Sequence, residues 1–295
     1  MIDTIHSELR VFRDDIYPFL GGGNKGRKIK YIEKAVDGNG CNAVVTTGGI
    51  QSNHCRALAL LAAQRGWKCT LVLHGNSGDF EIQNGNALLM RLSGAKIVFA
   101  EAAHIGAEMD RAITDFTAAG FKPYYIWGGG HMLEGGLAYI ESIAALADHC
   151  RETKWRPDYI FLASGTGSTQ AGILAGLDQY GLEAAVIGIS VARKKEQAEQ
   201  VVSDFYDKLC THYDIAKTNR KVIVMDDYLC GGYEKYNEAL LQLSIDSIKN
   251  YGFILDTTYS GKAFYGMQSY IKSHQITGNI LFWHTGGILN FIAQQ

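Results

Sequence analysis

The sequence is poor in proline and has no excess of either charge, and both features limit what the protein can be. Three prolines in 295 residues leave no Pro/Ser-rich linker, so we expect any second domain to be inserted compactly. The chain carries 28 basic and 30 acidic residues, which gives a net charge of −2. Such a balance does not favour nucleic acid or another polyanion as the main ligand.

Metal-type cysteine spacing and long apolar runs are also missing. The six cysteines include no CxxC pair, and no His/Cys spacing matches a zinc site, so we predict no metal centre. The N-terminus lacks the charged-then-apolar pattern of a signal peptide, and no apolar run is long enough to span a membrane. We therefore expect a reduced, cytoplasmic protein that binds neither membranes nor nucleic acid.

What the sequence does contain is a regular alternation of strand-like and helix-like segments. The predicted strands are residues 9–12, 42–47, 68–74, 95–100, 124–127, 158–163, 184–191, 221–226 and 279–283. The predicted helices are residues 28–36, 52–65, 84–92, 105–119, 137–149, 169–180, 194–213, 234–251 and 261–273. This alternation predicts an α/β fold in which parallel sheets carry helices on both faces. We expect two lobes, a small one at residues 41–152 and a larger one built from 1–40 and 153–295.

A glycine-rich stretch near the N-terminus places a lysine where a ligand can approach closely. Three consecutive glycines, residues 21–23, precede Lys25. One predicted strand later, a second glycine turn at residues 48–51 delivers Ser52 and Asn53 at the mouth of a helix. A lysine nucleophile that faces a helix N-terminus suits an enzyme that forms a Schiff base and binds an anion. The alternative for this stretch alone is a basic surface loop followed by a capped helix.

A further glycine turn, at residues 164–169, reads Ser-Gly-Thr-Gly-Ser-Thr and joins a predicted strand to a predicted helix. Its backbone N–H groups, its hydroxyls and the helix dipole would suit a phosphate. It lacks the ending of a Walker loop, and its third glycine, Gly172, comes too late for a dinucleotide fingerprint. An ordinary capped helix is the alternative. A lysine, an anion-binding helix mouth and a phosphate cup together suit pyridoxal phosphate.

These residues resemble a known family, the fold-type II pyridoxal-phosphate enzymes, and within it the group that joins D-cysteine desulfhydrase and 1-aminocyclopropane-1-carboxylate (ACC) deaminase. Five motifs in the family's order carry the resemblance, at residues 13–28, 49–54, 164–172, 259–263 and 284–287. The resemblance covers nearly the whole chain. It implies the two-lobed architecture of the tryptophan synthase β-subunit, pyridoxal 5′-phosphate as cofactor, a small amino acid as substrate and a homodimer.

The resemblance also implies roles for single residues around the lysine. Lys25 would be the Schiff-base lysine and proton carrier. Asn53 would hydrogen-bond the cofactor's phenolic oxygen. Ser52, with backbone N–H groups near Asn53 and His54, would hold the substrate carboxylate.

The phosphate would be held by one lysine and by the hydroxyl-rich loop. By resemblance, these residues are Lys28, Thr166, Gly167, Ser168 and Thr169.

Two tyrosines and two hydroxyl residues would set the chemistry on the substrate side. Tyr259 and Tyr233 would line that side as catalytic residues, although a packed aromatic is the alternative for Tyr233. The deaminases carry Glu at the position of Ser260 and Leu at that of Thr285, and the pair found here is the one typical of desulfhydrases. By resemblance, Thr285 would bind the cofactor's pyridine nitrogen as a hydroxyl rather than as an acid.

We therefore expect a pyridoxal-phosphate lyase that performs β-elimination on a small amino acid, as D-cysteine desulfhydrase does in releasing pyruvate, sulfide and ammonia. Three different functions stay open. ACC deamination is supported by deaminase-like residues at 48–50 and 167–172. β-Replacement in a biosynthetic pathway is suggested by altered substrate motifs at 230–233 and 256–259 and by only twelve residues before the first motif. A non-catalytic protein that keeps the fold is opposed by the intact Lys25, Ser52 and Asn53.

Overall fold

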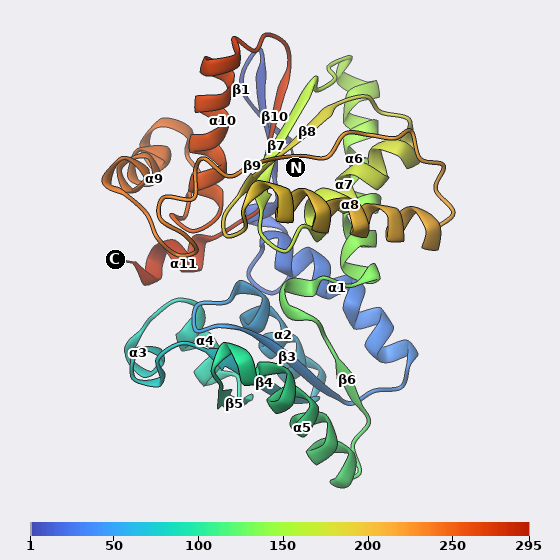
Figure 1. Cartoon of the computed structure of the whole chain (residues 1–295), viewed down its shortest axis with the longest axis vertical. Helices are drawn as coiled ribbons and strands as arrows, with labels where there is room; N and C mark the ends of the chain where they lie inside the picture. Colours follow the sequence, from blue (N-terminus) through green and yellow to red (C-terminus); the bar gives the residue numbers. More distant parts are fainter. Residues whose placement is uncertain (1, 295) are drawn as a thin grey trace.

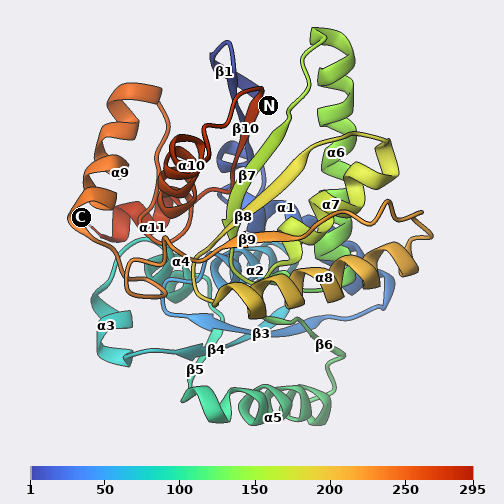
Figure 2. The same ribbon diagram turned by 45° about the horizontal axis from the view of Figure 1, so that its top comes forward.

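The computed structural model of the chain describes residues 2–294, and within them ten strands form two sheets. The larger sheet has the order β1-β2-β10-β7-β8-β9, and the smaller has the order β5-β4-β3-β6. Every pairing is parallel except that of β1 with β2. Figure 1 shows the two sheets one above the other, with α1 between the two halves, and the turned view in Figure 2 keeps that arrangement. The α/β fold with helices on both faces is confirmed.

The strands are short, as is usual for sheets of this kind. They are β1 (Ile2–His6), β2 (Leu9–Arg13), β3 (Ala43–Gly49), β4 (Lys68–His74), β5 (Lys96–Phe99), β6 (Pro123–Tyr125), β7 (Tyr159–Ser164), β8 (Ala185–Ser190), β9 (Ile223–Met225) and β10 (Ile280–His284). The α-helices are α1 (Gly23–Gly38), α2 (Asn53–Arg65), α3 (Ser77–Ile82), α4 (Asn86–Leu92), α5 (Ile105–Ala118), α6 (Leu133–Thr153), α7 (Ser168–Tyr180), α8 (Lys195–His212), α9 (Glu238–Tyr251), α10 (Ser260–His274) and α11 (Ile288–Ala293). Three 3₁₀ turns lie at η1 (Asp14–Ile16), η2 (Ala102–His104) and η3 (Gly128–Gly130).

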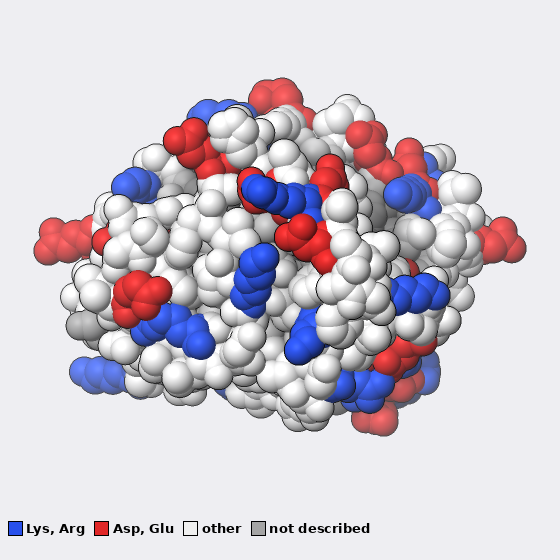
Figure 3. Space-filling model, turned by 90° about the horizontal axis from the view of Figure 1, so that it is seen from below, with Lys and Arg blue, Asp and Glu red and all other residues white. Residues whose placement is uncertain are grey.

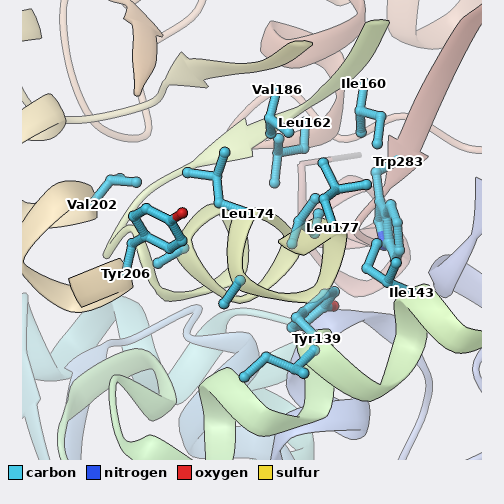
Figure 4. Close-up of a cluster of buried hydrophobic side chains, with 14 of the residues drawn as sticks. Tyr139, Ile143, Ile160, Leu162, Leu174, Leu177, Val186, Val202, Tyr206 and Trp283 are labelled. Carbon is cyan, nitrogen blue, oxygen red and sulfur yellow. The ribbon is translucent and has the colours of Figure 1, made fainter. Parts of the chain in front are cut away.

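The large sheet is buried on both faces because its central strands β7, β8 and β10 consist mostly of apolar residues and are almost wholly buried. Along β7, Ile160 and Leu162 pack with α6, α7 and α8, while Phe161 packs on the other face with α10. Figure 4 shows the first of these clusters, with Leu174 and Leu177 of α7 among the surrounding side chains. Truncating a buried leucine of this kind to alanine costs roughly 2–5 kcal/mol. This packing fixes the carboxyl ends of the strands, where the functional site lies.

The small sheet is also covered by apolar clusters on both faces, and together these clusters contain fewer residues than those of the large sheet. Val44 of β3 and Leu71 of β4 face the cluster beneath α2. Val45 and Val72, one position further along each strand, face the opposite cluster beneath α5. The strict alternation holds the register of β3, so that Gly48 and Gly49 end the strand at the edge that faces the large sheet's strand ends.

Helix α1 begins five residues earlier than the pattern predicts, so Lys25 lies in its first turn rather than in a loop. Residues 21–23 have positive φ, which glycine adopts without strain. Close packing also requires a glycine at position 26, because a Cβ on Gly26 would lie 2.3 Å from the carbonyl oxygen of Phe19. The glycines therefore bring a helix start, rather than a flexible loop, up to the ligand site.

Other differences concern short or irregular segments. The pattern missed β1, α3 and α11, and the helix predicted from residue 234 begins only at Glu238, where Asn237 caps it by accepting from the Leu240 N–H at 2.9 Å. Helix α6 is in the range predicted for the small lobe, yet Tyr139 and Ile143 pack in the core of the large sheet. We therefore propose that the lobe boundary precedes α6, and the division itself stays a prediction.

One face of the molecule shows the balance of basic and acidic residues found in the composition. The face seen from below carries basic and acidic side chains interspersed (Figure 3). Among the described residues, no helix is long and apolar enough to cross a membrane.

Candidate active site

A cavity of about 400 Å³ lies where the strand ends of the two sheets meet. Strands β3, β4, β7, β8 and β10 all direct their carboxyl ends, or the residues just after them, into its wall. Parallel α/β sheets bind ligands at this edge, because the loops and helix N-termini there present free backbone N–H groups. Eleven of the twelve residues predicted for the site line the cavity: Lys25, Lys28, Ser52, Asn53, His54, Thr166, Gly167, Thr169, Tyr233, Tyr259 and Thr285.

Lys25 presents its amine to the cavity from the first turn of α1. The Nζ atom donates a hydrogen bond to the carbonyl oxygen of Gly129 at 2.9 Å. Burial disfavours the ammonium form and lowers the pKa of Lys25 to about 8. A substantial fraction of the amine is therefore neutral near physiological pH, as a nucleophilic lysine requires. The carbonyl that holds it belongs to a turn that needs glycine, because Gly129 has φ +70° and a Cβ there would lie 2.8 Å from Thr166.

The N-terminus of α2 forms another part of the cavity wall. Ser52 is the N-cap, and its hydroxyl accepts from the Cys55 N–H at 3.2 Å. The N–H groups of Asn53 and His54 come first in this helix, where no intrahelical acceptor exists for them. This end of the helix can therefore hold a carboxylate.

His54 is neutral and fixed in one tautomer. Burial, reinforced by the charges of Lys25 and Lys28, lowers the pKa of His54 well below its usual range. Thr46 gives its single hydroxyl hydrogen to the carbonyl oxygen of Ile126 at 2.7 Å, so His54 Nε2 must donate to the Thr46 hydroxyl, 3.0 Å away. The Nδ1 atom is then a buried acceptor that has no partner among the described residues.

The loop after β7 forms a cup at the N-terminus of α7. Its residue Gly167 has φ +86° and precedes the helix, while Thr166 and Thr169 line the cavity. Ser168 is fully buried, and its hydroxyl accepts from Lys28 Nζ at 2.8 Å, so its side chain braces the lysine instead of facing the cavity. Burial, followed by the charge of Lys25, lowers the pKa of Lys28 well below its usual value. An anion bound in the cup would stabilise the charged form of Lys28 and so offset the desolvation cost of its burial.

Arg193 is a cavity residue that sequence reasoning missed. It stands in the basic run 193–195, a pattern that is typical of a solvated helix start. In the structure it follows β8, lines the cavity and donates to the carbonyl oxygen of Gly165 in the cup. Its location two residues after the predicted strand 184–191 is the signal that could have identified it.

The remaining wall carries three hydroxyl groups. Those of Tyr233 and Tyr259 hydrogen-bond to each other, and burial raises the pKa of both phenols, which are therefore protonated at neutral pH. Thr285 follows β10, and its carbonyl accepts from the Asn24 N–H at 2.9 Å. Ser260, by contrast, is buried outside the cavity wall, with its hydroxyl on Asp256 at 2.7 Å.

These features fit pyridoxal phosphate. The cavity contains a partly neutral lysine, a glycine turn at a helix N-terminus with a second buried lysine behind it, and a helix mouth for a carboxylate. Both buried lysines carry a desolvation cost that an aldehyde and a phosphate would relieve. The comparison with known proteins agrees, since the family model described as "Pyridoxal-phosphate dependent enzyme" matches residues 7–286. The chain belongs to this family.

Several solved structures share the fold. An ACC deaminase homologue is 29% identical, with a TM-score of 0.88 over 97% of this chain and 86% of that one. A hydrogen sulfide-producing enzyme from Fusobacterium nucleatum is 14% identical, with a TM-score of 0.62 over 97% of this chain and 91% of that one. A threonine deaminase from T.th. is also 14% identical, with a TM-score of 0.65 over 95% and 87% of the two chains. At 14% identity the last two show the fold alone.

Proposed function

We propose that this member of the family is a lyase that performs β-elimination on a small amino acid, with D-cysteine as the type substrate and pyruvate, sulfide and ammonia as products. The observation that carries the proposal is the charge of the cavity wall. Among residues 2–294, that wall contains Lys25, Lys28 and Arg193 but no carboxylate side chain. It suits an anionic cofactor and substrate, and it offers the cofactor ring a hydroxyl, Thr285, rather than an acid.

The residues that would hold the cofactor occupy separate walls. Lys25 would take the aldehyde, and Lys28 with Thr166, Gly167 and Thr169 would take the phosphate. When bound, pyridoxal phosphate supplies an electron sink for the electrons left on the substrate's α-carbon.

Asn53 and Thr285 would contact the two polar atoms of the cofactor ring. The Ser168 hydroxyl is engaged by Lys28, so its contribution to phosphate binding would come from its backbone N–H at the start of α7.

Substrate would be oriented by α2 and deprotonated by the lysine. Ser52 and the first N–H groups of the helix would bind the carboxylate, which places the α-carbon near Lys25. The lysine, with its pKa lowered to about 8, is the group able to accept the α-proton at neutral pH. Tyr233 and Tyr259 have raised pKa values, so they would act as hydrogen-bond donors or acids toward the leaving group.

The preference for elimination follows from Thr285. A hydroxyl cannot protonate the pyridine nitrogen as a carboxylic acid would, so the ring is a weaker electron sink. A reaction in which a β-substituent departs with the electrons needs less of that sink than the opening of a cyclopropane ring. A sulfur group on the β-carbon, leaving near the two tyrosine hydroxyls, would take these electrons with it.

ACC deamination is the second candidate, because the homologue at 29% identity is described by its likeness to ACC deaminase. A side-by-side assay of D-cysteine, L-cysteine, β-chloroalanine and ACC separates the two. Pyruvate from the β-substituted substrates at a higher kcat/KM supports the proposal. Faster release of 2-oxobutyrate from ACC would overturn it.

The same assay distinguishes elimination from β-replacement and from a non-catalytic role. Consumption of a β-substituted substrate with an added nucleophile, and formation of a new amino acid instead of pyruvate, would indicate β-replacement. Binding of the cofactor without turnover of the panel would favour a non-catalytic protein. We also propose a homodimer, which light scattering would test as a mass of twice 32.4 kDa.

A further inference from the structure

Behind the α2 wall lies a group of five polar side chains, the amide cluster: Gln51, Asn53, Arg56, Asn86 and Asn290. They come from the start of α2, from α4 and from the C-terminal helix α11. Arg56, Asn86 and Asn290 are 2%, 0% and 4% exposed. Buried amides of this kind have to satisfy their donors and acceptors inside the protein, so their orientations are set by one another.

The guanidinium of Arg56 sets the direction of the cluster, because it can only donate. Burial lowers the pKa of Arg56 to about 10, which leaves it charged at neutral pH. Its Nε donates to Asn86 Oδ1 at 3.0 Å, so the oxygen of the Asn86 amide faces the arginine. The amide nitrogen of Asn86 therefore faces away, and it lies 3.0 Å from Asn53 Oδ1 and 3.1 Å from the carbonyl oxygen of Gln51.

Asn53 is thereby held with its oxygen toward Asn86. Arg56 Nη2 adds a long contact of 3.5 Å to the same oxygen. The Asn53 nitrogen donates to Asn290 Oδ1, and Asn290 is itself fixed by its own donation to the Gln51 carbonyl oxygen at 3.1 Å. One of the two amide hydrogens of Asn53 is used in this way, and Asn53 also lines the cavity. The second hydrogen is left for the ligand.

We propose that Arg56, Asn86 and Asn290 are positioning residues that lock the Asn53 amide with a hydrogen toward the cavity, so that this wall selects an acceptor oxygen. The proposal rests on the proposed function in one respect, which is that the oxygen is the phenolic oxygen of pyridoxal phosphate. An unlocked amide could turn either its oxygen or its nitrogen to the cavity, so binding of an oxygen anion would carry the additional cost of orienting it.

The lock connects helix α11 to Asn53, a residue of the cavity wall. Helix α11 contacts α4 at Gly85, where an added Cβ would lie 2.3 Å from the Leu289 carbonyl oxygen and 2.9 Å from the Ala293 Cβ. This close approach fixes the position of Asn290 relative to Asn53. Helix α11 therefore fixes the side chain of Asn53, which begins α2 next to the small sheet.

Two nearly isosteric variants separate the lock from simple packing. In Asn86→Asp, the new carboxylate still accepts from Arg56 but offers no hydrogen to Asn53 or to the Gln51 carbonyl oxygen, so the Asn53 amide turns over. In Asn290→Asp, the residue still accepts from Asn53, so the orientation is kept, while the donation to Gln51 is lost. Ile292→Ala, an exposed change on the same helix, is the control. Each protein is titrated with pyridoxal phosphate, its visible absorption is followed against pH, and its thermal unfolding is recorded.

We expect Asn86→Asp to weaken cofactor binding roughly tenfold, the value of one lost hydrogen bond to a charged group. It should also raise the pH midpoint of the absorption change, because an oxygen anion that loses its donor holds its proton more tightly. Asn290→Asp should lower the melting temperature but keep the midpoint. Equal midpoints in both variants, or an unchanged midpoint and affinity in Asn86→Asp, would overturn the proposal.

A readout on the cofactor-free protein keeps the test independent of the proposed function. With ¹⁵N-asparagine labelling, the Asn53 side-chain amide signal, assigned by its loss in Asn53→Ala, should move in Asn86→Asp and stay in place in Ile292→Ala. Absence of pyridoxal phosphate binding by the unaltered protein would refute the proposed function alone. An Asn53 signal that is unmoved in Asn86→Asp would refute the lock alone.

Discussion

The ammonium nitrogen of Lys262 lies 2.7 Å from the carbonyl oxygen of Gly232, the residue directly before Tyr233. It also donates to the carbonyl oxygen of Leu229 at 2.8 Å, although Lys262 itself is fully buried in α10. The same helix begins directly after Tyr259. Helix α10 thus positions both tyrosines. Tyr259 is its N-cap, and Tyr233 follows the loop at residues 229–232, whose carbonyl groups Lys262 holds.

Replacing Lys262 by methionine should loosen this loop. The carbonyl groups of Leu229 and Gly232 would lose a charged donor, and we expect the protein to lose about 2–3 kcal/mol of stability. Because the loop carries Tyr233, kcat should fall more than the affinity for the cofactor. Lys272→Met, an exposed change on the same helix, is the matched control for both denaturation and kinetics. A fall in cofactor affinity with kcat unchanged would contradict the assignment.

Lys25 should combine with pyridoxal phosphate at a rate that reports its lowered pKa. Only the neutral amine attacks the aldehyde, so the rate for cofactor-free protein should rise with pH and level off above about 8. An ordinary lysine would continue to gain rate up to a pH of about 10. The measurement is the appearance of the visible band after mixing, and borohydride should then fix the cofactor on Lys25. Labelling of a different lysine would end the assignment.

Lys28 should bind the phosphate and nothing else of the cofactor. In Lys28→Met, affinity for pyridoxal phosphate should fall roughly 10–100-fold, the range expected for one buried charged contact. Affinity for pyridoxal, which lacks the phosphate, should change little. Lys30→Met, an exposed change in the same helix, serves as the control. Equal losses for the two ligands would indicate a structural defect instead of a phosphate contact.

The tyrosine pair should act as a unit and in its protonated form. Because burial raises the pKa of both phenols, kcat/KM should show no loss or gain from tyrosine ionisation between pH 7 and pH 9. Tyr259→Phe and Tyr233→Phe should each lower kcat, and the double variant should lose less than the product of the two effects. Independent, multiplicative losses would mean that the hydrogen bond between them has no part in the reaction.

Sequence periodicity predicts most of this fold, because its regular elements are long or apolar enough to produce a signal. Strand β4 matches the predicted range completely. Helix α2 ends at Arg65, as predicted, and the left-handed Gly66 is its C-cap. The elements that were missed are short. Helix α11 has six residues, fewer than two turns, so its apolar spacing cannot be distinguished from a loop. The partner of β1 is antiparallel, which the alternation of strands and helices does not suggest.

The site residues were predicted from motifs, and those that were missed act through distant contacts. Asn290 reaches Asn53 across 237 positions, and no local pattern marks such a pairing. Arg193 was hidden by its charged neighbours, which suggest solvent exposure. Ser260 was expected only to stand where the deaminases carry a glutamate, and its hydroxyl and its backbone N–H both donate to Asp256. A family motif fixes which residues occur, whereas side-chain direction depends on packing that only the structure shows.

The position of β10 has a consequence for how the chain matures during synthesis. Of the ten strands in residues 2–294, this one is synthesised last, yet it lies between β2 and β7 in the large sheet. It also supplies Trp283, whose indole N–H donates to Asp14 at 2.9 Å, next to the Arg27 and Tyr139 contacts of the same carboxylate. While residues 280–284 are still in the ribosome, β2 and β7 have no common neighbour, and the Asp14 carboxylate lacks one donor. The small sheet, in contrast, is complete at residue 125. Nascent chains stalled before residue 280 should therefore protect the small sheet from protease while the cofactor cavity does not yet exist.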